Sequence, residues 1–390
     1  MDGVKNRKWM LAPILALIVV FIFSLVQIPA AKQTPKNVPI AIVNEDAGMN
    51  TPNNGQMNAG DMIVKMITQA TNEKTDDKAP TVQWITVSNL ETAQKGMLEQ
   101  EYYGVLMIPS DYTVKQASLQ TPTPSSPEIN IYVNQGMNAM AANTVTQMLN
   151  GIVDNINKET RTKLLEAAKQ KGPSLTIEQA AIFGAPITKN VHYVNQTGTL
   201  ASAPTALFQP LWMGSIAGAL LMWFGLRKAG PSTPKNRLTA IAKQIVTGAI
   251  AAIVVGFGLA WIADGILGYD LPDFTSTALF LTLAYFSFIL MISAILTWIG
   301  IAGMPILVLL LFFGAPLLAL APEFMPTFYR DWVYSWLPMR FLIDGLREMF
   351  FFGKEFSWNQ PTSTLVWIGI GSIVVSCLSI LKPTTQKKTA

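Results

Sequence analysis

The sequence predicts a multi-pass α-helical membrane protein with six transmembrane helices and a mixed α/β extracytoplasmic domain between the first helix and the second. Three observations lead to this prediction: the apolar composition, the clustering of apolar residues into runs of helix length, and the one-sided distribution of basic residues. Half of the 390 residues are hydrophobic and only 13% are charged, whereas soluble chains have about a quarter charged residues.

The apolar residues form six uncharged runs, each long enough for one helix across a membrane. A helix of roughly 20 residues rises about 30 Å, which is the thickness of the hydrocarbon core. None of the six runs contains Asp, Glu, Lys, Arg or His. The runs are Met10–Ile28, Ala206–Leu226, Gln244–Ala263, Thr275–Ile299, Gly300–Ala321 and Thr362–Leu381.

The first apolar run follows a short basic segment, so a cleaved signal peptide is the alternative to a membrane anchor. The run is long for the apolar part of a signal peptide. Its end, Ile28-Pro29-Ala30-Ala31, is a poor match to the small-x-small pattern of cleavage sites. We therefore expect residues 1–30 to hold a cytoplasmic N-terminus and an uncleaved first span.

Basic residues predict how the spans are oriented. Cytoplasmic segments of membrane proteins are enriched in Lys and Arg. With the N-terminus inside, the cytoplasmic segments contain a single acid, Asp2, and the basic residues Lys5, Arg7, Lys8, Arg227, Lys228, Lys235, Arg237, Lys243, Lys382, Lys387 and Lys388. Both termini are therefore expected in the cytoplasm. The pI of about 9.0 reflects this topology and does not indicate nucleic-acid binding.

Residues 31–202 are expected to form the extracytoplasmic domain, because this length suits one folded domain. Strand patterns lie at 38–43, 81–87, 102–108 and 128–133. Helical patterns lie around 62–67, at 89–100 and at about 141–169, and a Pro/Ser/Thr linker lies at 121–127. In the first helical pattern, Met62, Ile63, Met66 and Ile67 are expected on one buried face. Such an alternation predicts a mixed α/β fold.

Residues 203–390 are expected to form a membrane core of five helices. A basic cytoplasmic loop, 227–243, joins the first two of them and contains Gly230-Pro231 and Pro234. Segment 322–361 is too polar to span the membrane but is rich in aromatic residues. Its centre, Leu337–Phe352, has the spacing of an amphipathic helix, which predicts a position at the outer membrane surface.

The sequence contains no residue pattern typical of an enzyme. It lacks a Gly-x-x-x-x-Gly-Lys-Ser/Thr phosphate loop and any Cys or His spacing for a metal, so we expect no catalytic residue, metal or cofactor. The single histidine, His192, lies in an apparent strand close to the second span. It has no accompanying nucleophile motif and is expected to be a surface or packing residue. Proton-coupled transporters need acidic or basic residues inside the membrane, and the six runs have none.

Several stretches resemble a known family in their order and spacing. They are 38–46 (Val-Pro-Ile-Ala-Ile-Val-Asn-Glu-Asp), 102–112 with its Tyr-Tyr-Gly start and Pro–Ser–Asp turn, Gly198–Leu211, and Leu337-Pro338 with Gly345-Leu346-Arg347. With one span, an outer domain and five further spans, the chain resembles the membrane subunits of type-2 ABC exporters. It is most similar to the branch related to the phage infection protein, the Pip/YhgE family.

The resemblance implies an export permease of a bacterial plasma membrane that works as a homodimer or paired permease. A separate ABC ATPase would supply the energy. In such permeases the loop between the second and third spans contacts the ATPase, so the resemblance assigns docking to Arg227, Lys228, Lys235, Arg237 and Lys243. Arg237 and Lys243 are expected to make the closest contacts. Positive-inside anchoring alone explains the same charges equally well.

Two other functions remain open at this point. The first is a cell-surface receptor or envelope scaffold, since relatives in the family are phage attachment factors, but such a domain needs one anchor and not six spans. The second is a membrane enzyme, which is disfavoured because the sequence shows no cluster of polar catalytic residues. Gly214 and Gly218 form a small-x-x-x-small pair in the second span, which favours close helix packing and suits a dimer contact.

Overall fold

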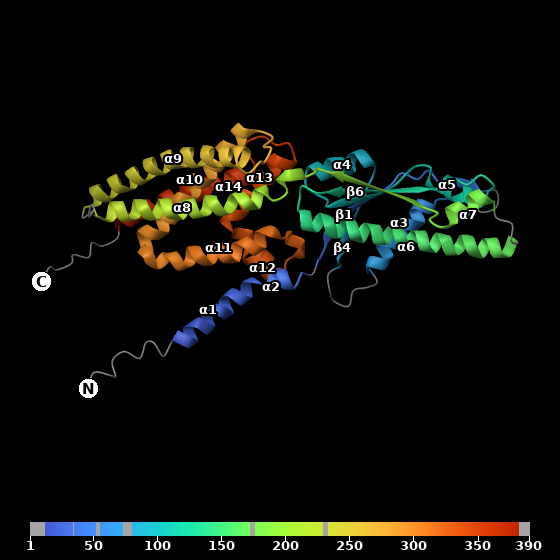
Figure 1. The fold of residues 1–390 in the computed structure, drawn as a ribbon, viewed down its shortest axis with the longest axis horizontal. Helices are drawn as coiled ribbons and strands as arrows, with labels where there is room; N and C mark the ends of the chain where they lie inside the picture. The colour runs from blue at the N-terminus through green and yellow to red at the C-terminus, as the bar shows by residue number, and fades with distance from the viewer. Residues whose placement is uncertain are drawn as a thin grey trace. The chain divides into compact units, whose positions relative to one another are not determined.

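The computed structural model describes residues 12–33, 35–51, 55–72, 80–171, 176–228 and 233–381 (Figure 1). The chain divides into two compact units. The α/β unit comprises Thr34–Gln196 and Leu320–Met325, and the helical unit comprises Met1–Gln33, Thr197–Ala319 and Pro326–Ala390. The predicted domain at 31–202 did not include the six residues from 320 to 325.

A five-stranded sheet with the order β4-β1-β5-β6-β7 forms the centre of the α/β unit. Its strands are β1 (Val38–Asn44), β4 (Val82–Val87), β5 (Gly104–Ile108), β6 (Glu128–Asn134) and β7 (Thr188–Val194). β1 is parallel to β4 and β5, β5 is antiparallel to β6, and β6 is parallel to β7. A separate hairpin pairs β2 (Met49–Thr51) with β3 (Gly55–Met57).

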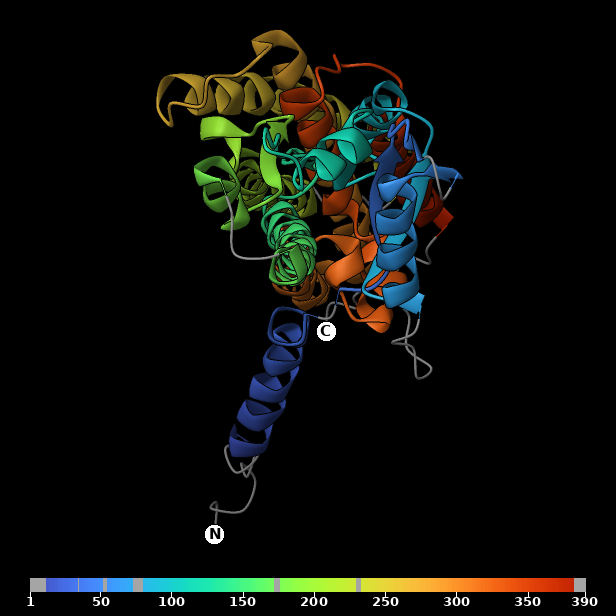
Figure 2. The ribbon, with the colours of Figure 1, turned by 90° about the vertical axis from the view of Figure 1, so that its right-hand side faces the viewer.

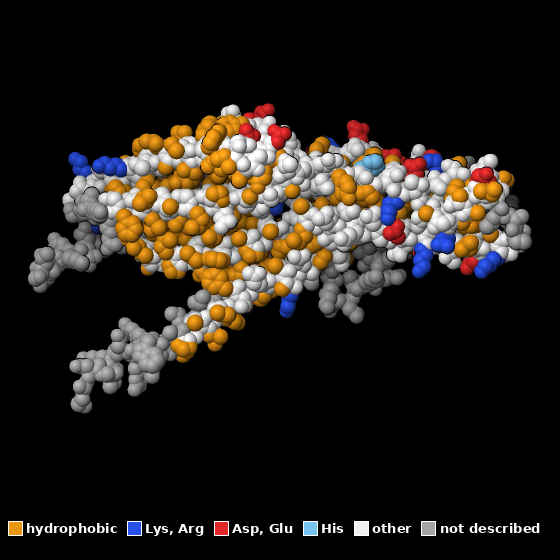
Figure 3. All heavy atoms as spheres, in the orientation of Figure 1, with side chains coloured by type: hydrophobic (Ala, Val, Ile, Leu, Met, Phe, Trp, Pro, Cys, Tyr) orange, Lys and Arg blue, Asp and Glu red, His pale blue; other side chains and the backbone are white. Residues whose placement is uncertain are grey.

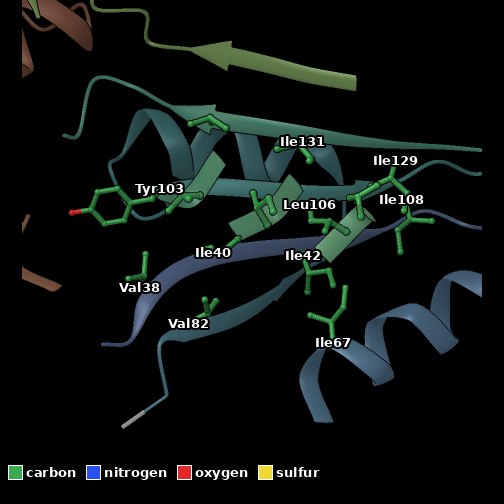
Figure 4. Close-up of a cluster of buried hydrophobic side chains, with 14 of the residues drawn as sticks. Val38, Ile40, Ile42, Ile67, Val82, Tyr103, Leu106, Ile108, Ile129 and Ile131 are labelled. Carbon is green, nitrogen blue, oxygen red and sulfur yellow. The ribbon is translucent and has the colours of Figure 1, made fainter. Parts of the chain in front are cut away.

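Helices cover both faces of this sheet. On one face, α3 (Ala59–Asn72), α5 (Tyr112–Ser118) and α6 (Ala139–Lys171) pack on Ile40, Ile42, Leu106, Ile129 and Ile131 (Figure 4). On the other, α4 (Leu90–Leu98) packs on Ala41, Val43 and Val105. A short helix, α7 (Ile177–Phe183), forms a small separate cluster with Leu119 and Leu164.

The face of α3 differs in part from the sequence prediction. Ile63 and Ile67 are buried in the core, as expected, but Met62 and Met66 are exposed. Neighbouring positions on a helix lie about 100° apart, so two adjacent pairs cannot share one narrow stripe. The packing of α3 on the sheet selects the isoleucine row.

The helical unit is arranged around one central helix, α10 (Phe274–Ile299), which packs against α8, α9 and α14. The other helices are α1 (Ala12–Val26), α2 (Ile28–Ala31), α8 (Ala203–Lys228), α9 (Pro234–Gly265), α11 (Met304–Ala319), α12 (Thr327–Trp332), α13 (Pro338–Phe351) and α14 (Gln360–Leu378). Figures 1 and 2 show α1 extending away from the other long helices of this unit. It packs on α11, where the rings of Phe23 and Phe312 meet edge to face at 4.8 Å.

Among the described residues, four helical stretches are long and apolar enough to cross a membrane: Ala203–Leu226, Pro234–Gly265, Phe274–Ala319 and Gln360–Leu381. The third has 46 residues and contains both α10 and α11, which are separated at Gly300–Gly303 by a 3-10 turn. Gly300 has φ +68°, a conformation that favours glycine and ends α10. The described part of the first span, α1, has 15 residues. The prediction of six spans therefore stays a prediction.

The surface of the helical unit is strongly apolar. Figure 3 shows hydrophobic side chains covering its helices, whereas charged side chains lie mainly at its ends and over the α/β unit. Large exposed side chains include Leu221, Val254, Trp261 and Trp367. A soluble protein rarely exposes such a continuous apolar surface, which is typical of contact with lipid.

Candidate functional site

The connection between α8 and α9 carries the basic residues to which the family resemblance assigned ATPase docking. α8 ends at Lys228, and α9 starts at Pro234, with Thr233 accepting a hydrogen bond from the N–H of Asn236 at 3.2 Å. Thr233 satisfies one free N–H of the first turn, and Pro234 suits the first helical position. The residues between 228 and 233, and the side chains of Arg227 and Lys228, lie outside the described part of the structure.

The remaining three basic residues of this loop lie in different surroundings. Lys235 is exposed in the first turn of α9. Arg237 is partly buried, and its guanidinium Nη1 donates to the carbonyl oxygens of Ser379 and Ile380 at 3.3 Å each. A cation at carbonyl groups that end a helix is stabilising, so Arg237 holds the end of α14 against α9. The third residue, Lys243, lies along a groove. Docking of an ATPase by these residues stays a prediction. The cytoplasmic position of the basic residues at the termini also stays a prediction, because those residues lie outside the described part of the structure.

A groove of about 550 Å³ lies between the end of α8 and the start of α9. Its wall is mostly apolar, and the polar side chains in it come from α9. The residues that line it are Met222, Gly225, Leu226, Thr239, Ala242, Lys243, Gln244, Val246 and Thr247. The sequence analysis did not identify this groove, because its two walls come from different helices. The only local signal was a Lys-Gln pair at the start of an uncharged run.

The glycine pair of α8 faces a helix of the same chain. A Cβ atom on Gly218 would lie 2.8 Å from Tyr285 Oη and 3.0 Å from Ile289 Cδ1, both on α10. The hydroxyl of Tyr285 also donates to the carbonyl of Gly214 at 3.2 Å. The small residues therefore allow α8 to approach α10 closely. A contact of this pair between two copies stays a prediction.

The amphipathic helix expected within Leu337–Phe352 is present as α13, and ion pairs form along it. Asp344 accepts from Arg340 Nε at 3.1 Å and lies 3.7 Å from Arg347 Nη1. Arg347 also donates to the carbonyl of Leu318 at 3.3 Å, which fixes the end of α11 to α13. Gly345 packs directly against the ring of Phe280 on α10, where a Cβ atom would overlap that ring. α13 is thus locked to two neighbouring helices.

The segment Leu320–Met325 follows α11 in the sequence but completes the core of the α/β unit. Phe324 is only 2% exposed within the cluster that contains Val38 and Ile40. Glu323 accepts a hydrogen bond from the hydroxyl of Tyr103 at 2.7 Å and, through its carbonyl, from the N–H of Lys36 at 2.9 Å. No periodic pattern marks so short a segment, which is why the sequence did not predict it.

A buried carboxylate organises one end of the sheet in the α/β unit. Asp46, which is 7% exposed, accepts hydrogen bonds from the N–H groups of Gly48, Gly60 and Thr113 and from the Thr113 hydroxyl. Burial alone would raise the pKa of Asp46, but these four donors together lower it below 3.8. The carboxylate therefore joins the starts of α3 and α5 to the end of β1, and all its donors belong to the fold.

Other chemistry is limited within the described ranges. No group of three or more His, Cys, Asp or Glu residues there is arranged to hold a metal ion. His192 is exposed and stacks on Tyr132, with ring centroids 4.9 Å apart. This position agrees with the surface or packing role that the sequence indicated.

Comparison with known families identifies the type of protein. The family described as "ABC-2 family transporter protein" matches residues 8–381, which is nearly the whole chain. The chain belongs to the ABC-2 transporter family. This membership agrees with the resemblance stated from the sequence.

A second comparison relates the ABC-2 chain to one named bacterial protein. It is 26% identical over 161 residues to the "Uncharacterized protein YhgE" of Bacillus subtilis (strain 168). The match covers 40% of this chain and a fifth of that protein's length. No solved structure matches the chain.

Proposed function

We propose that this chain is the membrane permease subunit of an ABC-type exporter, which moves its substrate outward with energy from a separate ATPase chain. The observation that carries the proposal is the family match along 374 positions, residues 8 to 381, combined with predicted spans that contain no Asp, Glu, Lys, Arg or His. Without such residues, a protein has no proton relay inside the membrane, so the energy must come from another chain.

The proposed topology has six spans, with both termini and the loop 227–243 in the cytoplasm and residues 31–202 outside. The apolar surface of the helical unit and the basic residues at the junction of α8 and α9 support it. α10 and α11 count as two spans because Gly300 ends the first helix within the apolar stretch. A helix of 16 residues such as α11 rises about 24 Å, so its flanking residues complete the crossing.

The ATPase is proposed to dock on the cytoplasmic junction of α8 and α9. Lys235 is the residue that we place at this contact, because it is exposed in the first turn of α9 and has no ion-pair partner among the described residues. Arg237 supports the contact indirectly, since it fixes the end of α14 beside α9. Movement of an attached ATPase would thereby reach both helices.

We propose two copies of the chain, or one copy and a related permease, around the transport pathway. The apolar and largely unpartnered α1 is one available surface for such a contact, with Leu17 and Phe21 more than half exposed. The alternative function is a surface receptor or scaffold. It does not explain why α10 packs closely against three other helices.

Affinity purification of the full chain in mild detergent tests the proposal. We expect an ABC ATPase to be captured and its ATP hydrolysis to increase when both chains are placed in liposomes. Lys235→Glu should lower the captured ATPase several-fold, whereas Lys158→Glu, an exposed charge reversal on α6, should not. Accumulation of a substrate by the chain alone under a proton gradient would overturn the proposal.

A further inference from the structure

The groove between α8 and α9 has the chemistry of a lipid site, and we propose that it binds an anionic phospholipid from the surrounding leaflet. In this arrangement an acyl chain lies along the apolar wall, and the phosphate contacts Lys243 and Gln244. The proposal concerns a ligand of the permease itself and does not depend on an ATPase partner. It also separates Lys243 from the other basic residues of the loop.

The first reason is the level at which the groove lies in the membrane. α9 has 32 residues and is therefore about 48 Å long, which exceeds a hydrocarbon core of about 30 Å. Its uncharged part runs from Gln244 to Ala263 and fits that thickness. Lys243 and Gln244 consequently lie where the hydrocarbon core meets the lipid headgroups. An exposed lysine at this level is within reach of a phosphate.

The second reason is a buried polar side chain in the wall of the groove. Gln244 is only 6% exposed as a residue, and it lines the groove. A glutamine amide carries two N–H donors. A phosphate oxygen in the groove would accept a hydrogen bond from this amide.

Charge and shape together select the occupant. Among the described residues that line the groove, Lys243 is the only charged one, so the site favours a negative headgroup over a zwitterionic one. Met222, Leu226, Ala242 and Val246 form a wall suited to a hydrocarbon chain. A second copy of the chain, or a segment of an ATPase, would need more hydrogen-bonding side chains than this wall provides. These two occupants are alternative outcomes of the test.

Native mass spectrometry of the delipidated full chain, titrated with phosphatidylglycerol or phosphatidylcholine, tests the site. We expect one phosphatidylglycerol to bind more tightly than phosphatidylcholine, and inorganic phosphate not to displace it, because the acyl chain contributes to binding. Lys243→Gln should weaken the tightest phosphatidylglycerol binding by about tenfold, equivalent to about 1.4 kcal/mol. Gln244→Leu should weaken it as well.

The matched control is Lys235→Gln, which removes one positive charge from the same helix outside the groove and should leave phosphatidylglycerol binding unchanged. Equal loss in Lys235→Gln and Lys243→Gln would mean that the lipid responds only to overall charge, and would overturn the proposal. Equal binding of the two lipids by the unaltered chain would overturn it too.

Two further results would assign the groove to another occupant. If Lys243→Gln lowers dimer formation without changing lipid binding, the groove is an interface between copies. If it lowers ATPase capture without changing lipid binding, the residue belongs to docking. The last result would overturn the lipid site and leave the proposed transport function intact.

Discussion

The two units of this protein satisfy their buried polar groups in different ways. In the α/β unit, side chains link elements that are distant in the sequence. The amide of Asn134 donates to the carbonyl of Met97 at 2.8 Å, and that of Asn157 donates to the carbonyl of Ile187 at 2.9 Å. The carboxylate of Asp46 joins one strand to two helices. These bonds help to fix the tertiary structure.

In the helical unit, most hydroxyl groups bond within their own helix. Ser215 donates to the carbonyl of Leu211 at 2.8 Å, and Thr282 donates to that of Ala278 at the same distance. Such bonds satisfy the hydroxyl but connect no other element. Close helix contact comes instead from small residues: Gly256 on α9 meets the backbone of Thr282 on α10, and Gly218 on α8 meets Tyr285.

The difference follows from the solvent that each unit faces. In water, apolar burial assembles the sheet and its helices, and polar links are exchanged for bonds to water at little net cost. In lipid, burying apolar side chains between helices gives little free energy, because the lipid is also apolar. Helices are therefore held together by close packing, and their polar groups are satisfied by local hydrogen bonds. The segment 320–325 crosses this division, because it joins the core of the α/β unit although both its neighbours in sequence belong to the helical unit.

The largest expected effect tests whether the α/β unit depends on that segment. Phe324→Ala removes a ring that is 2% exposed in the core, and truncation of a buried Phe typically costs about 3–5 kcal/mol. We expect faster hydrogen exchange in β1 and β5 of the full chain. Phe328→Ala is the control, because that ring is 63% exposed. Unchanged exchange in Phe324→Ala would show that residues 34–196 are stable without the segment.

The next effect tests close packing in the helical unit. Gly256→Val places side-chain atoms against the backbone of Thr282, which cannot move aside as a side chain can. Overpacking of this kind costs about 1–3 kcal/mol. We expect a lower melting temperature in detergent and little change in the exchange of the α/β unit. Gly258→Val is the matched control, two residues along α9, where no atom lies within 4 Å. Equal loss in both variants would mean that helix propensity, and not packing, sets the effect.

A third effect, which depends on pH, tests the carboxylate network. Asp46→Asn leaves one oxygen to receive bonds that two charged oxygens accept, at a cost of about 1–3 kcal/mol near neutral pH. Because the folded pKa of Asp46 is below 3.8, its contribution is complete above that pH and is lost as the pH falls through the lower folded value. The difference between variant and unaltered chain, measured by hydrogen exchange in α3, should therefore shrink below about pH 4.

The control for this network is Asp154→Asn, since the Asp154 side chain is 64% exposed in a surface ion pair with Lys189. Exposed pairs contribute about 0–1 kcal/mol. A deficit in Asp46→Asn that stays constant down to pH 3 would show that loss of packing, and not loss of charge, causes it.

The amino-acid sequence by itself determined the apolar helices, the strands of the five-stranded sheet, the amphipathic helix α13 and the membrane class of the protein. Each is a local property: runs of apolar residues and their period fix which segments are helices or strands, whatever they later contact. The family resemblance, which the comparison confirmed, was carried in the same way by the order of those segments.

Only the tertiary structure decided which elements meet. It placed Phe324 in the core of the other unit, paired Gly256 with Thr282, turned Arg237 toward the end of α14 and formed the groove that contains Lys243. Contacts of this kind join residues that are tens to hundreds of positions apart, and spacing along one segment carries no information about the partner across the gap. The tertiary structure likewise decided that the isoleucines of α3, and not the adjacent methionines, are buried.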